Sequence, residues 1–208
     1  MFQKSSIALI PIIFIYLLIT YYNQTFIITD ELYWNSYGWQ LSNKQFNDYL
    51  TFSKKWQWVG YLFVPVAIII RLSFVWICLK VGSFFREDIF SVSFWRICIQ
   101  AEVVFVVGAV AGLLYSEFFV DIKTLEQLSV NQFSMQAIVS DIAPKWSSYI
   151  FNTLNIFEFG YVFVLAYLIK EESKIKFLPS LNFVASTYLP GLALWVLLVS
   201  YLSVVFQP

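Results

Sequence analysis

Five long apolar runs, separated by polar connections, constrain the fold of this chain of 208 residues more than any other feature. Each run has about the 20 residues that an α-helix needs to cross the roughly 30 Å hydrocarbon core of a bilayer. Helices are favoured there because they satisfy their own backbone hydrogen bonds where water is absent. The sequence therefore predicts an all-α integral membrane protein with one transmembrane domain over residues 1–208, a bundle of about five helices spanning 7–22, 58–79, 97–115, 149–169 and 184–206.

The composition supports a surface that faces lipid. Hydrophobic residues make up 60% of the chain and charged residues only 12%, about half the charged share of soluble domains. The formal net charge is zero, so no overall field attracts nucleic acid. We expect the lipid bilayer and other membrane proteins as partners, and no nucleic acid.

The first run follows Lys4 and has an apolar middle, so a cleaved signal peptide is the alternative interpretation. The run ends at Tyr21-Tyr22-Asn23-Gln24, without the small residues of a cleavage site. We therefore interpret it as an uncleaved first span.

Lysine and arginine are unevenly distributed between the two sets of connections. The N-terminus and the short connections 80–96 and 170–183 hold seven, and the long connections 23–57 and 117–148 hold five. Basic connections remain in the cytoplasm, which predicts a cytoplasmic N-terminus and a C-terminus outside. Rich use of Phe, Ile, Tyr, Lys and Asn is typical of AT-rich bacterial genomes and favours a bacterial inner membrane.

The two long connections are expected to contain short interfacial helices. Thr124 and Gln127 fit a capping box, and the apolar residues that follow predict an amphipathic helix over 124–139. This helix would lie in the headgroup region or pack on the bundle. The aromatic residues of 33–58 indicate a similar arrangement.

Ionisable side chains inside apolar runs are the strongest candidates for function, since each costs roughly 2.5–3.5 kcal/mol near the bilayer centre. Arg71 in the second run and Glu102 in the third lie at comparable depth on consecutive antiparallel helices. The sequence predicts that they form an ion pair. A structural pair, or an arginine that reaches toward the interface, is favoured over a functional one.

Asn152, Asn155 and Glu158 are spaced by three, which predicts that they share one face of the fourth span. Such a stripe should face the bundle interior. It would either line a polar cavity for a proton, cation or small polar substrate, or bind neighbouring helices through hydrogen bonds. The second interpretation is slightly favoured.

Pro65, Pro190 and Gly191 predict helix kinks in the second and fifth spans. Kinks of this kind line sites in transporters, but they are also ordinary in membrane helices. Cys78 and Cys98 are expected to be small, buried apolar residues near the cytoplasmic face.

The sequence lacks the residues of common enzymes and metal sites. It has no histidine, which excludes histidine-based catalysis and metal binding, and two cysteines alone do not form a zinc site. It contains no G-x-S-x-G, P-loop or G-x-G-x-x-G motif. We expect no enzymatic activity, no catalytic residue, no metal and no cofactor.

The C-terminal half carries a family resemblance. Residues 153–158 (Thr-Leu-Asn-Ile-Phe-Glu) continue to 167–169 (Tyr-Leu-Ile), and a short basic connection leads to a run containing 188–190 (Tyr-Leu-Pro). This pattern, together with 84–94, resembles bacterial members of the Yip membrane-protein family. The resemblance implies a compact five-helix membrane domain. Eukaryotic members act with Rab GTPases in vesicle traffic, and bacterial members have no agreed activity.

These observations favour one function and leave a second one open as the alternative. The first is a non-enzymatic membrane scaffold or accessory subunit, in trafficking or secretion, with the aromatic connections as its docking surface. The second is a small transporter or channel subunit, with a polar path lined by Glu158, Asn152 and Asn155 and a gate formed by Arg71 and Glu102. An enzyme acting on lipids with Glu102 and Glu158 as acids is a more remote third possibility.

Overall fold

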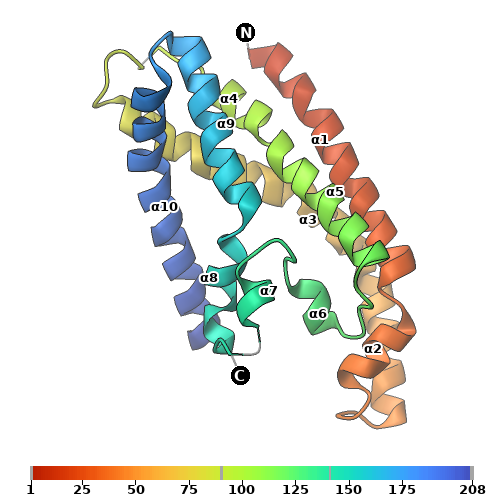
Figure 1. The fold of residues 1–208 in the computed structure, drawn as a ribbon. Helices are drawn as coiled ribbons and strands as arrows, with labels where there is room; N and C mark the ends of the chain where they lie inside the picture. The colour runs from red at the N-terminus through yellow and green to blue at the C-terminus, as the bar shows by residue number, and fades with distance from the viewer. Residues whose placement is uncertain (1, 90, 141, 207–208) are drawn as a thin grey trace.

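The computed structural model describes residues 2–89, 91–140 and 142–206, and its ordered elements are helices (Figure 1). The long helices are α1 (Phe2–Tyr22), α3 (Asn43–Ser83), α5 (Val103–Phe118), α9 (Ile156–Ser173) and α10 (Phe177–Val205). The shorter ones are the π-helix η1 (Asn23–Ile27), α2 (Asp30–Tyr37), α4 (Phe94–Ala101), α6 (Leu125–Ser129), α7 (Gln136–Val139), the 3-10 helix η2 (Lys145–Ser147) and α8 (Ser148–Thr153). In these ranges the only strand-like pairing is an isolated antiparallel bridge between Ser134 and Asn155. The predicted all-α fold is confirmed.

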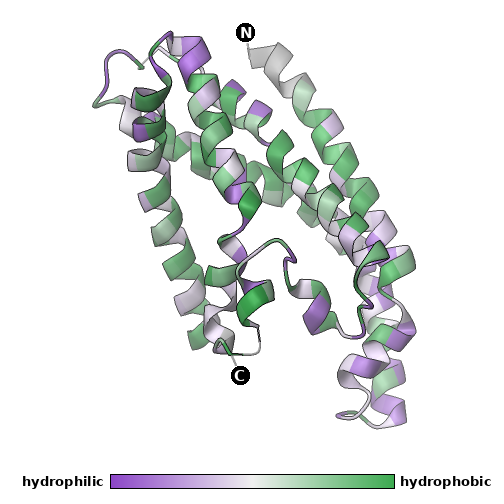
Figure 2. Cartoon of the chain, viewed as in Figure 1, coloured by the Kyte–Doolittle hydropathy of each residue, from purple (hydrophilic) through white to green (hydrophobic). Residues whose placement is uncertain are grey.

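Within the described residues, four helical stretches are long and apolar enough to cross a membrane. They are Ala8–Ile27 (α1 with η1), Asn43–Ser83 (α3), Phe94–Phe118 (α4 with α5) and Phe177–Val205 (α10). These stretches overlap the first, second, third and fifth predicted spans. Figure 2 shows hydrophobic residues along the middle of the long helices and hydrophilic ones concentrated nearer both ends. Helices of this kind are compatible with an integral membrane protein.

The long helices run between two ends of the molecule, and the two termini lie at opposite ends (Figure 1). The N-terminus, residues 84–89 and 91–93, and the connection 174–176 lie at one end, which we call the basic end. The helices α2, α6, α7 and α8 lie toward the other end, which we call the C-terminal end.

The core lies closer to the basic end, where α3, α4, α9 and α10 pack together. Its fully buried side chains include Leu72, Val75, Leu79, Ile97, Leu165, Ile169 and Val184. Toward the C-terminal end α10 diverges from α1, α3 and α5, and the segment with α6, α7 and α8 lies between them (Figure 1). The helices are therefore closely packed at one end and separated by inserted chain at the other.

The second predicted span, 58–79, is only part of a much longer helix. α3 has 41 residues, which at 1.5 Å per residue is about 60 Å, roughly twice the hydrocarbon thickness. It begins at a capping box: the Gln45 N–H donates to Ser42 Oγ, and the Ser42 N–H donates to Gln45 Oε1 at 3.0 Å. The predicted interfacial structure of 33–58 is therefore α2 and the first part of α3.

The fourth predicted span, 149–169, is wrong as a continuous helix. α8 ends at Thr153 and α9 begins at Ile156. Between them the Met135 N–H donates to the Leu154 carbonyl at 3.0 Å, and the Ile156 N–H donates to the Phe133 carbonyl at 3.3 Å. The backbone here is paired with another segment, so it does not continue the helix.

The single amphipathic helix predicted over 124–139 is also wrong. Only α6 and α7 form there, because residues 133–135 between them pair with the chain at the α8–α9 break. Half of the predicted capping box is present: Thr124 Oγ1 accepts from the Gln127 N–H at 3.3 Å. The Gln127 side chain instead accepts from the Lys123 N–H at 2.9 Å.

Glycines bring α3 and α10 into close contact. A Cβ atom on Gly191 would lie 2.6 Å from Cys78 Sγ, and one on Gly82 would collide with the side chain of Thr187. Small residues allow such close approach between membrane helices. Pro65 and Pro190, the residues of the predicted kinks, lie inside α3 and α10, and both helices continue past them. Cys98 is buried and Cys78 partly buried, and both are free thiols.

We predict that Gly82→Ala weakens the α3–α10 contact. The added methyl group meets the β-branched Thr187, whose Cβ would lie 2.9 Å away, and overpacking of this kind costs about 1–3 kcal/mol. The matched control is Gly112→Ala on α5, where a Cβ meets nothing within 4 Å and helix propensity improves by up to about 1 kcal/mol. The free energy of unfolding of both variants is measured in detergent micelles. Equal stability of the two variants would contradict the predicted contact.

Candidate functional site

An ion pair joins the partly buried Arg71 of α3 to the fully buried Glu102, which connects α4 to α5. Arg71 Nη2 donates to Glu102 Oε1, and also to the hydroxyl of Tyr16 on α1 at 3.2 Å. The Glu102 side chain has no exposed surface, whereas that of Arg71 keeps 36%. The predicted pairing is confirmed, and it adds a contact to α1 that sequence analysis missed.

Local packing holds the Arg71 guanidinium from a second side. Its Cζ lies 4.4 Å from the centroid of the Phe105 ring, one turn after Glu102 on α5. A cation over an aromatic face is attracted by the ring quadrupole, and the attraction increases when water is excluded. Together, the contacts of Arg71 with Glu102, Tyr16 and Phe105 offset the free-energy cost of burying its charge.

A second polar contact joins α9 to α10. The hydroxyl of Tyr188 donates to Glu158 Oε1 at 2.5 Å. Tyr161 lies between this contact and the ion pair, with ring centroids 4.7 Å from Phe105 and 5.8 Å from Tyr188. The buried Glu102 carboxylate and the partly buried Glu158 carboxylate are thus linked through packed aromatic rings.

Three polar atoms of this cluster are buried without a hydrogen-bond partner among the described residues: Arg71 Nε, Glu102 Oε2 and the Tyr161 hydroxyl. Buried polar groups normally find a hydrogen-bond partner. The three unpaired atoms around this ion pair therefore distinguish the region from an ordinary core.

Asn152, Asn155 and Glu158 do not share one helix face, because the helix is broken between the first and the last of them. Asn152 Oδ1 accepts from the Asn131 N–H at 3.0 Å and from Ser134 Oγ at 3.3 Å. Asn155 is the N-cap of α9, since its Oδ1 accepts from the Glu158 N–H at 2.9 Å. Glu158 therefore lies in the first turn of α9 rather than near the middle of a span.

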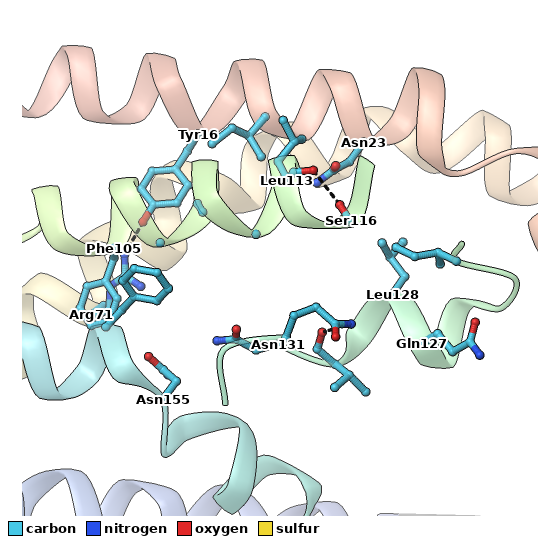
Figure 3. Close-up of a pocket in the computed structure, with 18 residues that line it drawn as sticks. Tyr16, Asn23, Arg71, Phe105, Leu113, Ser116, Gln127, Leu128, Asn131 and Asn155 are labelled. Atoms are coloured by element: carbon cyan, nitrogen blue, oxygen red, sulfur yellow. Dashed lines mark hydrogen bonds between the residues drawn. The ribbon is translucent and has the colours of Figure 1, made fainter. Parts of the chain in front are cut away.

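A cavity of about 370 Å³ extends from Arg71 toward the C-terminal end (Figure 3). Its walls come from α1 with η1, α5, the α5–α9 connection and the start of α9. Its polar lining includes Tyr16, Asn23, Arg71, Ser116, Asn131 and Asn155. Of the residues selected from sequence, Arg71 and Asn155 line this cavity, and Asn152 lines a separate hollow of about 660 Å³ near α6 and α7.

The cavity does not continue past Arg71. Beyond this residue, toward the basic end, Leu72 and Val75 of α3 and Leu165 of α9 are fully buried. Arg71 therefore closes one end of the cavity, which extends from this residue in one direction.

Sequence analysis missed most of the lining residues because each is one polar group within an apolar run or a connection. One signal was present on α5. Residues Phe105, Gly108, Ala109, Gly112 and Ser116 recur at helical spacing, which places them on one face. Four of these five are small, and a face of small residues leaves space beside it. In the part of the chain that the structure describes, no group of three His, Cys, Asp or Glu residues could hold a metal ion.

No protein-family model, curated protein or solved structure matches this chain. The resemblance to the Yip family therefore stays a prediction, and the site is interpreted from its own geometry.

We predict that Glu102→Leu destabilises the protein by about 3 kcal/mol, the lower end of the range for breaking buried pairs, because Arg71 keeps a third of its surface open. The double variant Arg71→Met/Glu102→Leu should recover most of this loss, since no unpaired charge remains. Denaturant titration in detergent measures the free energy of unfolding of the native protein and of each variant. Lys54→Met, which breaks the exposed pair with Asp30, is the control and should cost at most about 1 kcal/mol. A double variant less stable than Glu102→Leu would contradict the expectation.

Proposed function

We propose that this chain is a non-enzymatic integral membrane protein that binds a small molecule in the cavity above Arg71, as a small transporter or a substrate-binding subunit of one. The main support for this proposal is the cavity. Its volume of about 370 Å³ falls within the range of small-molecule sites, about 300–1,000 Å³. Its lining combines apolar side chains with convergent polar groups, as such sites do.

The helix break beside the cavity supports this function. Non-helical backbone within a membrane is tolerated where protein buries it or where it lines a cavity. Transporters commonly form their sites at interrupted helices. The break at Leu154–Asn155 is stabilised by pairing with residues 133–135, and Asn155 itself lines the cavity.

We further propose five membrane crossings, with α9 as the fourth. α9 carries charged residues at its end, among them Lys170, Glu171 and Glu172. It packs against α4, α5 and α10, so that Tyr161, Leu165 and other residues of its inner face are buried by protein rather than by lipid. An odd number of crossings agrees with termini at opposite ends (Figure 1). The basic end would face the cytoplasm of a bacterial cell and the cavity would face outward.

We predict that Gly112→Leu abolishes ligand binding without unfolding the protein. Gly112 lines the cavity, and a Cβ there meets nothing within 4 Å, so the larger side chain fills empty space. The measurement is thermal unfolding of the protein in nanodiscs, screened against small carboxylates, amines, amides and sugars. At least one compound should stabilise the native protein and not Gly112→Leu. If none does so, or if the variant responds equally, the cavity is not a binding site.

A second candidate function, a membrane scaffold or accessory subunit in trafficking or secretion, is favoured by the surface of α2 and the first part of α3. Residues 43–57 precede the most apolar part of this long helix and would extend beyond the hydrocarbon core. Exposed aromatic side chains cover this surface: Trp34, Trp39, Phe52, Trp56 and Trp58. Aromatic residues are enriched where proteins bind one another.

For this candidate we predict that a partner membrane protein co-purifies in mild detergent and is lost in the variant Trp39→Ser/Phe52→Ser/Trp56→Ser. These side chains are exposed, so their replacement removes contact area without opening the core. Trp146→Ser, which removes an exposed tryptophan outside this surface, is the control and should retain the partner. A native chain that always purifies alone would exclude the scaffold function.

A further inference from the structure

We infer that the ligand of the cavity is an organic anion, with a carboxylate or phosphate oxyanion bound by Arg71 and a small apolar body along the cavity walls. This inference rests on the proposed function, since it specifies the chemistry of the molecule that the same cavity binds.

The first support is the unused hydrogen-bonding capacity of Arg71. A guanidinium group has five N–H donors. Both hydrogen bonds that Arg71 makes within the described residues come from Nη2, one to Tyr16 and one to Glu102. Nε is buried without a partner, which leaves the two N–H groups of Nη1. Each of these N–H groups can donate a charge-assisted hydrogen bond to an oxygen of a carboxylate or phosphate.

The second support is the placement of the two charges relative to the cavity. Arg71 lines it and keeps 36% of its side-chain surface, whereas Glu102 has no exposed surface and does not line it. A ligand therefore meets the guanidinium before the carboxylate. Among the described residues that line the cavity, Arg71 is the one charged group. A cationic ligand would meet this positive charge with no lining carboxylate to balance it.

The third support is the distribution of neutral groups along the walls. Amide groups of Asn23 and Asn131 lie farther from Arg71, as Figure 3 shows, and supply donors and acceptors for a polar substituent. Apolar side chains such as Leu113, Leu128 and Phe157 form much of the remaining wall. This combination fits an amphipathic anion better than a small inorganic ion, which would leave the apolar walls without contact.

Two sources could supply such an oxyanion: a free carboxylate from the aqueous phase, or the phosphate headgroup of a lipid that enters between the helices. Both present the same group to Arg71. The experiment therefore compares phosphatidylcholine nanodiscs, whose headgroup phosphate is esterified with choline, with nanodiscs that contain phosphatidic acid, whose phosphate lacks the choline group and carries more negative charge.

The test uses the full chain in phosphatidylcholine nanodiscs and three probes with one apolar body: 4-phenylbutyrate, 4-phenylbutanamide and 4-phenylbutylamine. We expect saturable thermal stabilisation by the carboxylate, with an affinity about tenfold or more above those of the amide and the amine, since a charge-assisted pair contributes this much. Equal stabilisation by the amide or the amine would overturn the inference, as would no response to the carboxylate.

Two variants test whether thermal stabilisation by the carboxylate depends on Arg71. Arg71→Gln/Glu102→Gln removes both charges together and should weaken carboxylate binding about tenfold or more. Arg86→Gln, which removes a basic residue outside the cavity that pairs with Asp88, should bind like the native protein. If the double variant does not fold, Gly112→Leu still decides the matter, because it must abolish the carboxylate effect. Undiminished stabilisation in either of these cavity variants would overturn the inference.

The lipid arm repeats the carboxylate titration in nanodiscs that contain phosphatidic acid. A weaker apparent affinity supports a lipid phosphate as the occupant, and an unchanged affinity supports a free anion.

Failure of the inference can be distinguished from failure of the proposed function. If the amide stabilises the native protein equally but has no effect on Gly112→Leu, the cavity binds small molecules without preferring anions.

Discussion

Burial of the Glu102 carboxylate is the constraint on which the centre of this molecule depends. The side chain has no exposed surface, so its charge must be balanced within the protein. Arg71 supplies the opposite charge, and Tyr16 and Phe105 hold its guanidinium from two sides. These contacts fix α3 against α1 and against the α4–α5 junction at a single depth. Because Arg71 is only partly covered, the guanidinium that pairs with Glu102 also lines one end of the cavity.

The cavity exists because small residues leave one wall recessed and an inserted segment occupies the space between diverging helices. On α5, Gly108 lies so close to Phe157 that a Cβ would be 2.8 Å from its ring, whereas Gly112 faces open space. One glycine thus permits contact with α9, and the other contributes volume. The inserted segment is tied to the α8–α9 break by the Asn131–Asn152 hydrogen bond and the backbone pairing at Leu154. Packing and cavity are therefore two results of the same arrangement.

The helical class and the central ion pair could be predicted from sequence because hydropathy and depth are local properties. Arg71 and Glu102 stand out as charges in apolar runs, and two antiparallel helices bring equal depths together. The break at Leu154–Asn155 was missed because apolar runs look alike whether one helix or two cross them. A signal was nevertheless present: an Asn three residues before a Glu marks a helix start. A similar pattern, Ser42 with Gln45, marked the start of α3.

The unequal packing of the two ends limits what any transport cycle could look like. Movement of a ligand past Arg71 would have to separate side chains that are fully buried at the basic end, among them Leu72, Val75 and Leu165. The α3–α10 contact at Gly82 and Gly191 is close, and beside it Phe74 of α3 packs against Tyr188 and Trp195 of α10. Interdigitated side chains of this kind resist sliding, because rotamers must change before the two helices can shift. Binding from the C-terminal end requires no such movement, whereas release at the basic end would require this helix pair to shift.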